Sequence, residues 1–137
     1  MHRNAKRAAT LLLLLLIAIA GFCSCSRQGT LARQIASADR LVVSNVYDGF
    51  TISIKGDEAK QVVEAVSAAR KESDPGLSTC RELRIEFFQG TNFLGTVEAC
   101  RALIGIDRMP YIDRTGVLEA LADKLRQERL KSTLHDR

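Results

Sequence analysis

Residues 80–100, CRELRIEFFQGTNFLGTVEAC, decide the fold of this chain. Leu83, Ile85 and Phe87 alternate with charged residues on the first arm of this stretch, and a period of two indicates a strand with one buried face. Gly90 lies near the middle, where the chain can turn back, and the second arm again places apolar residues on one side. The stretch therefore predicts a β-hairpin whose apolar face covers a core.

The pairing of the two arms is predicted from their faces. A slip of one residue turns every side chain of one strand to the other face. Pairing Phe88 with Phe93 would set the apolar row of the first arm against a mostly polar row. Pairing Leu83 with Val97 and Phe87 with Phe93 makes one side apolar throughout, so we expect this second register.

The first 24 residues have the layout of a secretory signal peptide. Arg3, Lys6 and Arg7 precede the apolar run 11–22, which small residues and cysteines follow. The run is short for a membrane span of about 20 residues, so an uncleaved anchor is the second alternative. Cleavage would remove three cationic side chains and no acidic one, which lowers the formal net charge from +4 to +1. This near-neutral mature chain argues against a nucleic-acid partner.

Residues 21–25, Gly-Phe-Cys-Ser-Cys, resemble the lipobox of the bacterial lipoprotein signal. In that family a small residue precedes a cysteine that receives diacylglycerol and becomes the mature N-terminus. The resemblance makes Ser24 the small residue and Cys25 the lipidated one, with Cys23 as the rival site behind the bulky Phe22. It implies a protein of the bacterial cell envelope, held by its lipid on the periplasmic side of the outer or inner membrane, or on the outer face of a plasma membrane.

Cys80 and Cys100 are the thiols that remain once Cys23 leaves with the signal and Cys25 is acylated. An even pair in an oxidising compartment predicts a disulfide, and the expected register places the two cysteines opposite each other. A C-x-x-C motif and further zinc ligands are missing from the sequence. We therefore expect a structural disulfide, no metal site and no cofactor.

The rest of the chain divides into a tether at 25–38, one α+β domain at 39–131 and a mobile tail at 132–137. We expect a two-layer fold, in which two amphipathic helices cover one face of an antiparallel sheet of four to six strands and the other face stays open to solvent. Ile54-Lys55-Gly56 and Tyr111-Ile112-Asp113, each before an expected helix, make this layout similar to small envelope lipoproteins of unknown function.

Asp48-Gly49 predicts a two-residue type I′ turn in a first hairpin, with Tyr47 opposite Phe50 and Val43 opposite Ile54. The path of the chain between Ala99 and Leu103 stays open. The other expected elements are a helix that begins at Asp57, strands at 103–106 and 111–112 around a turn at 107–110, and a helix at 115–130.

Residues for catalysis are scarce. The chain has two histidines, one in the signal and one in the C-terminal tail, so an imidazole base or a Ser/His/Asp site is not expected. The alternative to a binding module is an enzyme or metal-binding protein built on carboxylates. Asp107 with Asp113, and Glu82 opposite Glu98, are its candidates, although turn formation and helix capping explain these residues more simply.

Two surfaces are candidates for binding. Val42, Val46, Phe88 and Leu94 fall on the open side of the two hairpins, where a cluster of apolar residues would indicate a partner surface.

A second candidate is a rim of arginines at the cysteine end of the hairpin. Arg81 and Arg101 would lie there together, and with Arg84 or Arg108 they could bind an anion, although such side chains also serve purely structural roles. The sequence thus predicts a non-catalytic binding or accessory module, with a protein or another component of the envelope as its partner.

Overall fold

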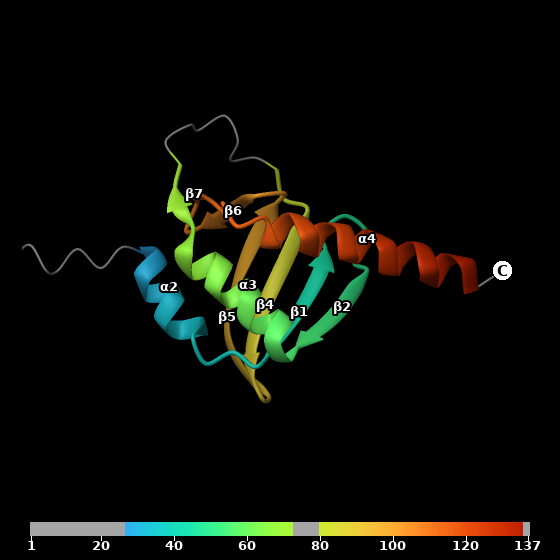
Figure 1. The fold of residues 1–137 in the computed structure, drawn as a ribbon, viewed down its shortest axis with the longest axis horizontal. Coiled ribbons are helices and arrows are strands. Elements are labelled where there is room, and N and C mark those ends of the chain that lie inside the picture. The colour runs from blue at the N-terminus through green and yellow to red at the C-terminus, as the bar shows by residue number, and fades with distance from the viewer. Residues whose placement is uncertain (1–26, 73–79, 136–137) are drawn as a thin grey trace, which may run out of the picture.

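The computed structural model describes residues 27–72 and 80–135 (Figure 1). Their seven strands form one antiparallel sheet in the order β2-β1-β4-β5-β6-β7-β3. The fold is therefore α+β, with more strands than the four to six expected. In chain order the elements are α2 (Arg27–Ile35), β1 (Arg40–Asn45), β2 (Thr51–Lys55), α3 (Gly56–Ala68), β3 (Arg70–Lys71), β4 (Leu83–Gln89), β5 (Asn92–Cys100), β6 (Leu103–Ile106), β7 (Met109–Ile112) and α4 (Val117–His135).

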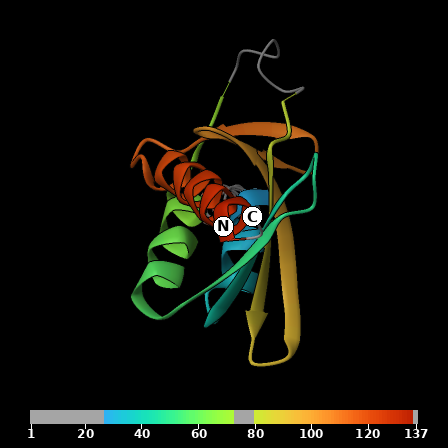
Figure 2. The ribbon, with the colours of Figure 1, turned by 90° about the vertical axis from the view of Figure 1, so that its right-hand side faces the viewer.

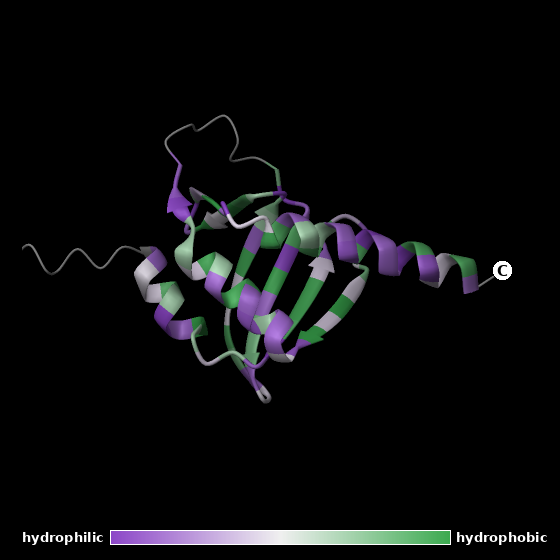
Figure 3. Ribbon diagram, viewed as in Figure 1, coloured by the Kyte–Doolittle hydropathy of each residue, from purple (hydrophilic) through white to green (hydrophobic). Residues whose placement is uncertain are grey.

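The three helices lie on one face of the sheet (Figures 1 and 2). Apolar and polar residues alternate along the strands beneath them (Figure 3), as expected of a sheet with one buried face. Leu41, Val43, Ile85 and Phe87 are fully buried on that face. Within the described ranges no helix covers the opposite face, which we call the outer face.

The register of β4 and β5 differs by two residues from the predicted one. Ile85 pairs with Val97, and Arg84 pairs with Glu98. A shift of two keeps the side chains of residues 83–87 and 95–99 on their predicted faces. It also replaces the like-charge pair of Glu82 and Glu98 by an ion pair, because a guanidinium nitrogen of Arg84 lies 3.4 Å from the Glu98 carboxylate.

A β-bulge at Leu94 changes the faces near the hairpin tip. Phe87 pairs with Gly95 but Phe88 pairs with Phe93, which leaves Leu94 as the extra residue. Phe93 consequently joins Phe88 on the outer face, with ring centroids 5.7 Å apart, while Leu94 packs against the core. The prediction that Leu94 belongs to an outer binding surface is therefore wrong.

The first hairpin lacks the predicted type I′ turn. Leu41 pairs with Ile54, two residues from the expected register, and the loop spans residues 46–50. A type I′ turn needs positive φ at both central residues, but of Asp48 and Gly49 only the glycine has one. The Asn45 side chain instead accepts hydrogen bonds from the backbone N–H groups two and three residues further on, at 2.8 and 3.3 Å. This local competition explains the longer loop.

The type I′ geometry occurs between β6 and β7. Ile106 pairs with Met109, so Asp107 and Arg108 are the two central residues, with φ of 49° and 66°. Left-handed conformations are costly for residues with a Cβ. The arginine therefore holds a position at which glycine would be the less strained residue.

Helix α2 corrects the expectation of a tether at 25–38. Ile35 is fully buried, and Leu31 lies over Gly95 of β5, where a Cβ on the glycine would meet the leucine at 3.4 Å. The Gln28 amide donates hydrogen bonds to carbonyl groups at the C-terminal end of α3, among them Ser67 at 3.1 Å. Residues 27–35 are therefore part of the folded domain.

Helix α4 corrects the expectation of a mobile tail at 132–137, since the helix continues to His135; of that segment, residues 136 and 137 lie outside the described chain. The buried Asp113 caps its first turn, as its carboxylate accepts a hydrogen bond from the Leu118 N–H at 3.0 Å. The last turns extend beyond the sheet (Figure 1), with Leu130 and Leu134 exposed. No helix in the described ranges combines the length and apolar content needed to cross a bilayer.

Candidate ligand-binding cavity

A cavity of about 370 Å³ lies on the outer face of the sheet. It forms because β6 and β7 run across one end of β4 and β5 (Figure 1), so the twisted sheet becomes concave there. Four strands contribute to its wall: Arg84 and Glu86 from β4, Thr96 and Glu98 from β5, Leu103 and Gly105 from β6, and Pro110 from β7.

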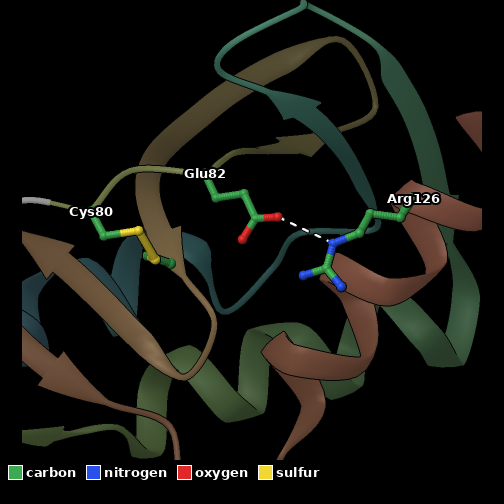
Figure 4. Close-up of a disulfide and its surroundings, with 4 residues drawn as sticks. Cys80, Glu82 and Arg126 are labelled. Atoms are coloured by element: carbon green, nitrogen blue, oxygen red, sulfur yellow. Dashed lines mark hydrogen bonds and ion pairs between the residues drawn. A yellow bond between two sulfur atoms is a disulfide. The ribbon is translucent and has the colours of Figure 1, made fainter.

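Arginine and carboxylate groups pair along one side of this cavity. The Glu98 carboxylate lies 3.0 Å from Nε of Arg81 and 3.4 Å from a terminal nitrogen of Arg84, so two guanidinium groups share one acid. Glu82, which was expected opposite Glu98, instead pairs with Arg126 of α4 at 3.3 Å (Figure 4). The cavity wall thus already binds one carboxylate, that of the protein itself.

Arg108 and Glu86 also line the cavity, and neither forms an ion pair within residues 27–72 or 80–135. Arg108 is exposed at the tip of the β6–β7 turn, and Glu86 is half-buried on the outer side of β4. One cationic and one anionic side chain therefore remain able to pair with a ligand.

Arg101 does not belong to this group. Cys100 pairs with Leu103, so Arg101 and Ala102 form a two-residue turn, which settles the path of the chain after Ala99. The turn gives Arg101 a φ of 52° and leaves its side chain outside the cavity lining. Of the predicted anion rim, the structure brings together Arg81 with Arg84 and Arg108, but not Arg101.

The disulfide between Cys80 and Cys100 supports the wall of the cavity. Their Cα atoms are 5.5 Å apart, although the two residues are not cross-strand partners in the observed register. Instead, residues 80–82 leave the strand direction, and the Glu82 N–H donates to the Ala99 carbonyl at 2.9 Å. Figure 4 shows the bond beside Glu82. The disulfide therefore fixes the segment that carries Arg81.

The other predicted surface does not form a patch. Val42 and Phe88 are half-buried on the outer face, and the guanidinium of Arg40 lies 4.3 Å from the centre of the Phe88 ring. Val46 is 41% exposed in the loop after β1, and Leu94 points to the core. A charged group thus covers the largest apolar member of this set.

The predicted carboxylate pairs do not come together either. Asp113 caps α4, Glu82 and Glu98 pair with arginines, and Asp107 is exposed in its turn. Within the described ranges, no three side chains of His, Cys, Asp or Glu are grouped so that they could hold a metal ion.

Comparisons of the chain with protein-family models, curated proteins and solved structures gave no match. The cavity is therefore the candidate functional site of the described chain.

The sequence alone does not predict this cavity as a site. Its signal was partial: Arg84 and Glu86 were visible as charged positions on the outer side of a strand, and Arg108 appeared as an optional member of a rim. The concave shape depends on how β6 and β7 cross the hairpin, and local periodicity carries no information about that crossing.

Proposed function

We propose that the chain is a lipid-anchored protein of the bacterial cell envelope that acts as a non-catalytic binding or accessory module, and that the outer-face cavity is its binding site. The observation that carries this proposal is the pair of ionisable side chains, Arg108 and Glu86, that line the cavity without ion-pair partners in the described chain. A ligand with complementary groups would give both of them charge-assisted hydrogen bonds.

The dimensions and lining of the cavity suit a small molecule. A volume of about 370 Å³ falls in the range of about 300 to 1,000 Å³ that is common for such sites. Leu103 and Pro110 supply apolar surface beside the charged groups. Mixed linings of this kind fix the orientation of a ligand through a few polar contacts.

The proposed anchor is a lipid on Cys25, with Cys23 as the alternative site. Through this lipid the protein would bind the membrane. In cells fed labelled palmitate, we expect wild-type protein and the Cys23→Ala variant to carry label and the Cys25→Ala variant to carry none. Label that persists on Cys25→Ala and disappears on Cys23→Ala would move the anchor to the rival cysteine. A wild-type protein without label would contradict the lipid anchor.

The cavity can be filled without disturbing the backbone. Gly105 has no left-handed φ, and a Cβ added to it would meet only the Glu98 carbonyl, at 3.8 Å. We expect Gly105→Phe to abolish the binding of small fragments that the wild-type protein binds. Ligand-observed NMR with a mixed library of apolar, anionic, cationic and zwitterionic fragments measures this loss.

The matched control is Ser53→Phe, which adds the same side chain at an exposed position of β2 that is outside the cavity lining. We expect this variant to bind fragments as the wild type does. Melting curves show whether both variants remain folded. Fragment binding that survives Gly105→Phe, or no fragment binding to the wild type, would contradict a site in this cavity.

A further inference from the structure

We infer that the cavity takes a small zwitterion with an apolar body, an amino acid or a dipeptide, whose carboxylate pairs with Arg108 and whose ammonium group pairs with Glu86. This inference rests on the proposed function, because it takes the outer-face cavity as the binding site. It adds the chemical class of the ligand and the residue that recognises each end.

Two arginines of the cavity already bind a carboxylate, which indicates how the carboxylate of a ligand would bind. Arg81 and Arg84 hold the carboxylate of Glu98 at 3.0 and 3.4 Å. Arg108 lines the same cavity and has no such partner among the described residues. A guanidinium group presents a planar set of donors that matches a carboxylate. Arg108 therefore has the capacity to bind one more carboxylate, and a ligand can supply it.

The conformation of Arg108 supports the same assignment. Its φ of 66° is unfavourable for a residue with a Cβ, and a glycine would relieve that strain. Here the turn between β6 and β7 places the arginine at the mouth of a cavity.

Glu86 is the residue that would bind the ammonium group of the ligand. This side chain lies on the outer side of β4, between Val42 of β1 and Thr96 of β5, and is half-buried without an ion-pair partner in the described chain. An acid in this position can accept charge-assisted hydrogen bonds from a ligand ammonium group. Thr96 also lines the cavity, beside the acid, and adds a hydroxyl to this end.

The spacing of the two ends fits a compact ligand. Glu86 is on β4 and Arg108 is in the turn that follows β6, so β5 lies between the strands that carry the two residues. The glutamate and arginine side chains reach across part of this gap. The ammonium and carboxylate groups of the ligand would lie between these two side chains, and its apolar side chain would lie against Leu103 and Pro110.

Isothermal titration or NMR titration with matched probes tests the inference. Leucine and leucyl-leucine carry both charges, 4-methylpentanoate lacks the ammonium group of leucine, and 3-methylbutylamine lacks its carboxylate. We expect at least one zwitterion to bind with a dissociation constant in about the millimolar range or tighter. We expect it to bind at least about tenfold more tightly than either single-charge probe, since each charged contact contributes a charge-assisted hydrogen bond.

Three variants assign the two ends. Arg108→Gln should remove the advantage of the zwitterion over the amine, and Glu86→Gln should remove its advantage over 4-methylpentanoate. Arg101→Gln is the control, because it removes the same charge from a neighbouring turn, also at a left-handed position, but outside the cavity. We expect it to change affinity less than about twofold, which is within the ordinary range for surface charges.

The outcomes separate this inference from the function on which it rests. Fragments that bind the wild type but not Gly105→Phe, with no preference for zwitterions, would overturn the inference and leave the cavity as a binding site. An equal loss for Arg108→Gln and Arg101→Gln would show a general effect of charge and would also overturn the inference. Absence of any binding that is sensitive to Gly105→Phe would overturn both.

Discussion

Phe87→Ala is expected to lower the free energy of unfolding by about 3 to 5 kcal/mol. Phe87 is the largest fully buried side chain of the described chain, and it pairs across the hairpin with Gly95, which has no side chain to fill the space. Truncation removes apolar contact and leaves a cavity beneath the helices. Equilibrium unfolding in urea, followed by circular dichroism, measures the change.

The neighbouring Phe88→Ala is the control for this prediction, because the two phenylalanines lie on opposite faces of β4. Phe88 is half-buried, and its contacts are the ring of Phe93 and the guanidinium of Arg40. Loss of one aromatic contact and one cation–π contact should cost about 1 to 2 kcal/mol. Equal losses for the two variants would contradict the assignment of faces.

Removal of the disulfide is expected to lower the free energy of unfolding by about 3 kcal/mol, as estimated for a closed loop of this length. Cys80 and Cys100 are 20 residues apart, and the bond holds the segment before β4 against the end of β5. Without it the unfolded chain gains conformational freedom that the folded state does not. Urea unfolding of the wild-type protein, with and without reductant, measures the loss.

The double variant Cys80→Ala with Cys100→Ala is the control for reduction. It should match the reduced wild-type protein in stability, and reductant should not change it further. Titration of thiols on the mature, unreduced protein gives an independent readout, with no reactive thiol expected at these two positions. Two reactive thiols would contradict a structural disulfide.

Apart from Phe93 and Leu94 at the bulge, the faces of the hairpins could be predicted from sequence, but their registers could not. A period of two identifies which residues are buried, and this information survives a shift by two residues. In the β4–β5 hairpin the choice between such registers depends on side-chain pairing. Apolar matching favoured Glu82 opposite Glu98, whereas the observed register gains an ion pair between Arg84 and Glu98.

The turns show the same limit of local signals. Asp48-Gly49 is a strong type I′ sequence, yet the Asn45 side chain bonds to the following backbone and opens the loop. Asp107 and Arg108 adopt the type I′ geometry without the glycine that predicts it. Pairing of β6 with β7 imposes that conformation, and a local pattern does not report such tertiary contacts.

The docking of α2 was missed for a related reason. Two apolar residues, Leu31 and Ile35, are too few to predict a packed helix by periodicity. Their partner is Gly95, more than 50 residues further along the chain, whose missing side chain makes room for them. The cavity likewise depends on contacts between distant strands, whereas its arginines could be named from the sequence.

The position of α2 determines how far the domain can move from a bilayer if the lipid is on Cys25. Residues 27–35, which the expected tether includes, are held in the folded domain and add nothing to its reach. A flexible tether of 13 residues would have reached about 20 Å on average. A shorter linker would hold the domain close to the lipid headgroups and restrict its rotation. Ligands of the domain would then bind at the membrane surface, because the domain could not extend further from the bilayer.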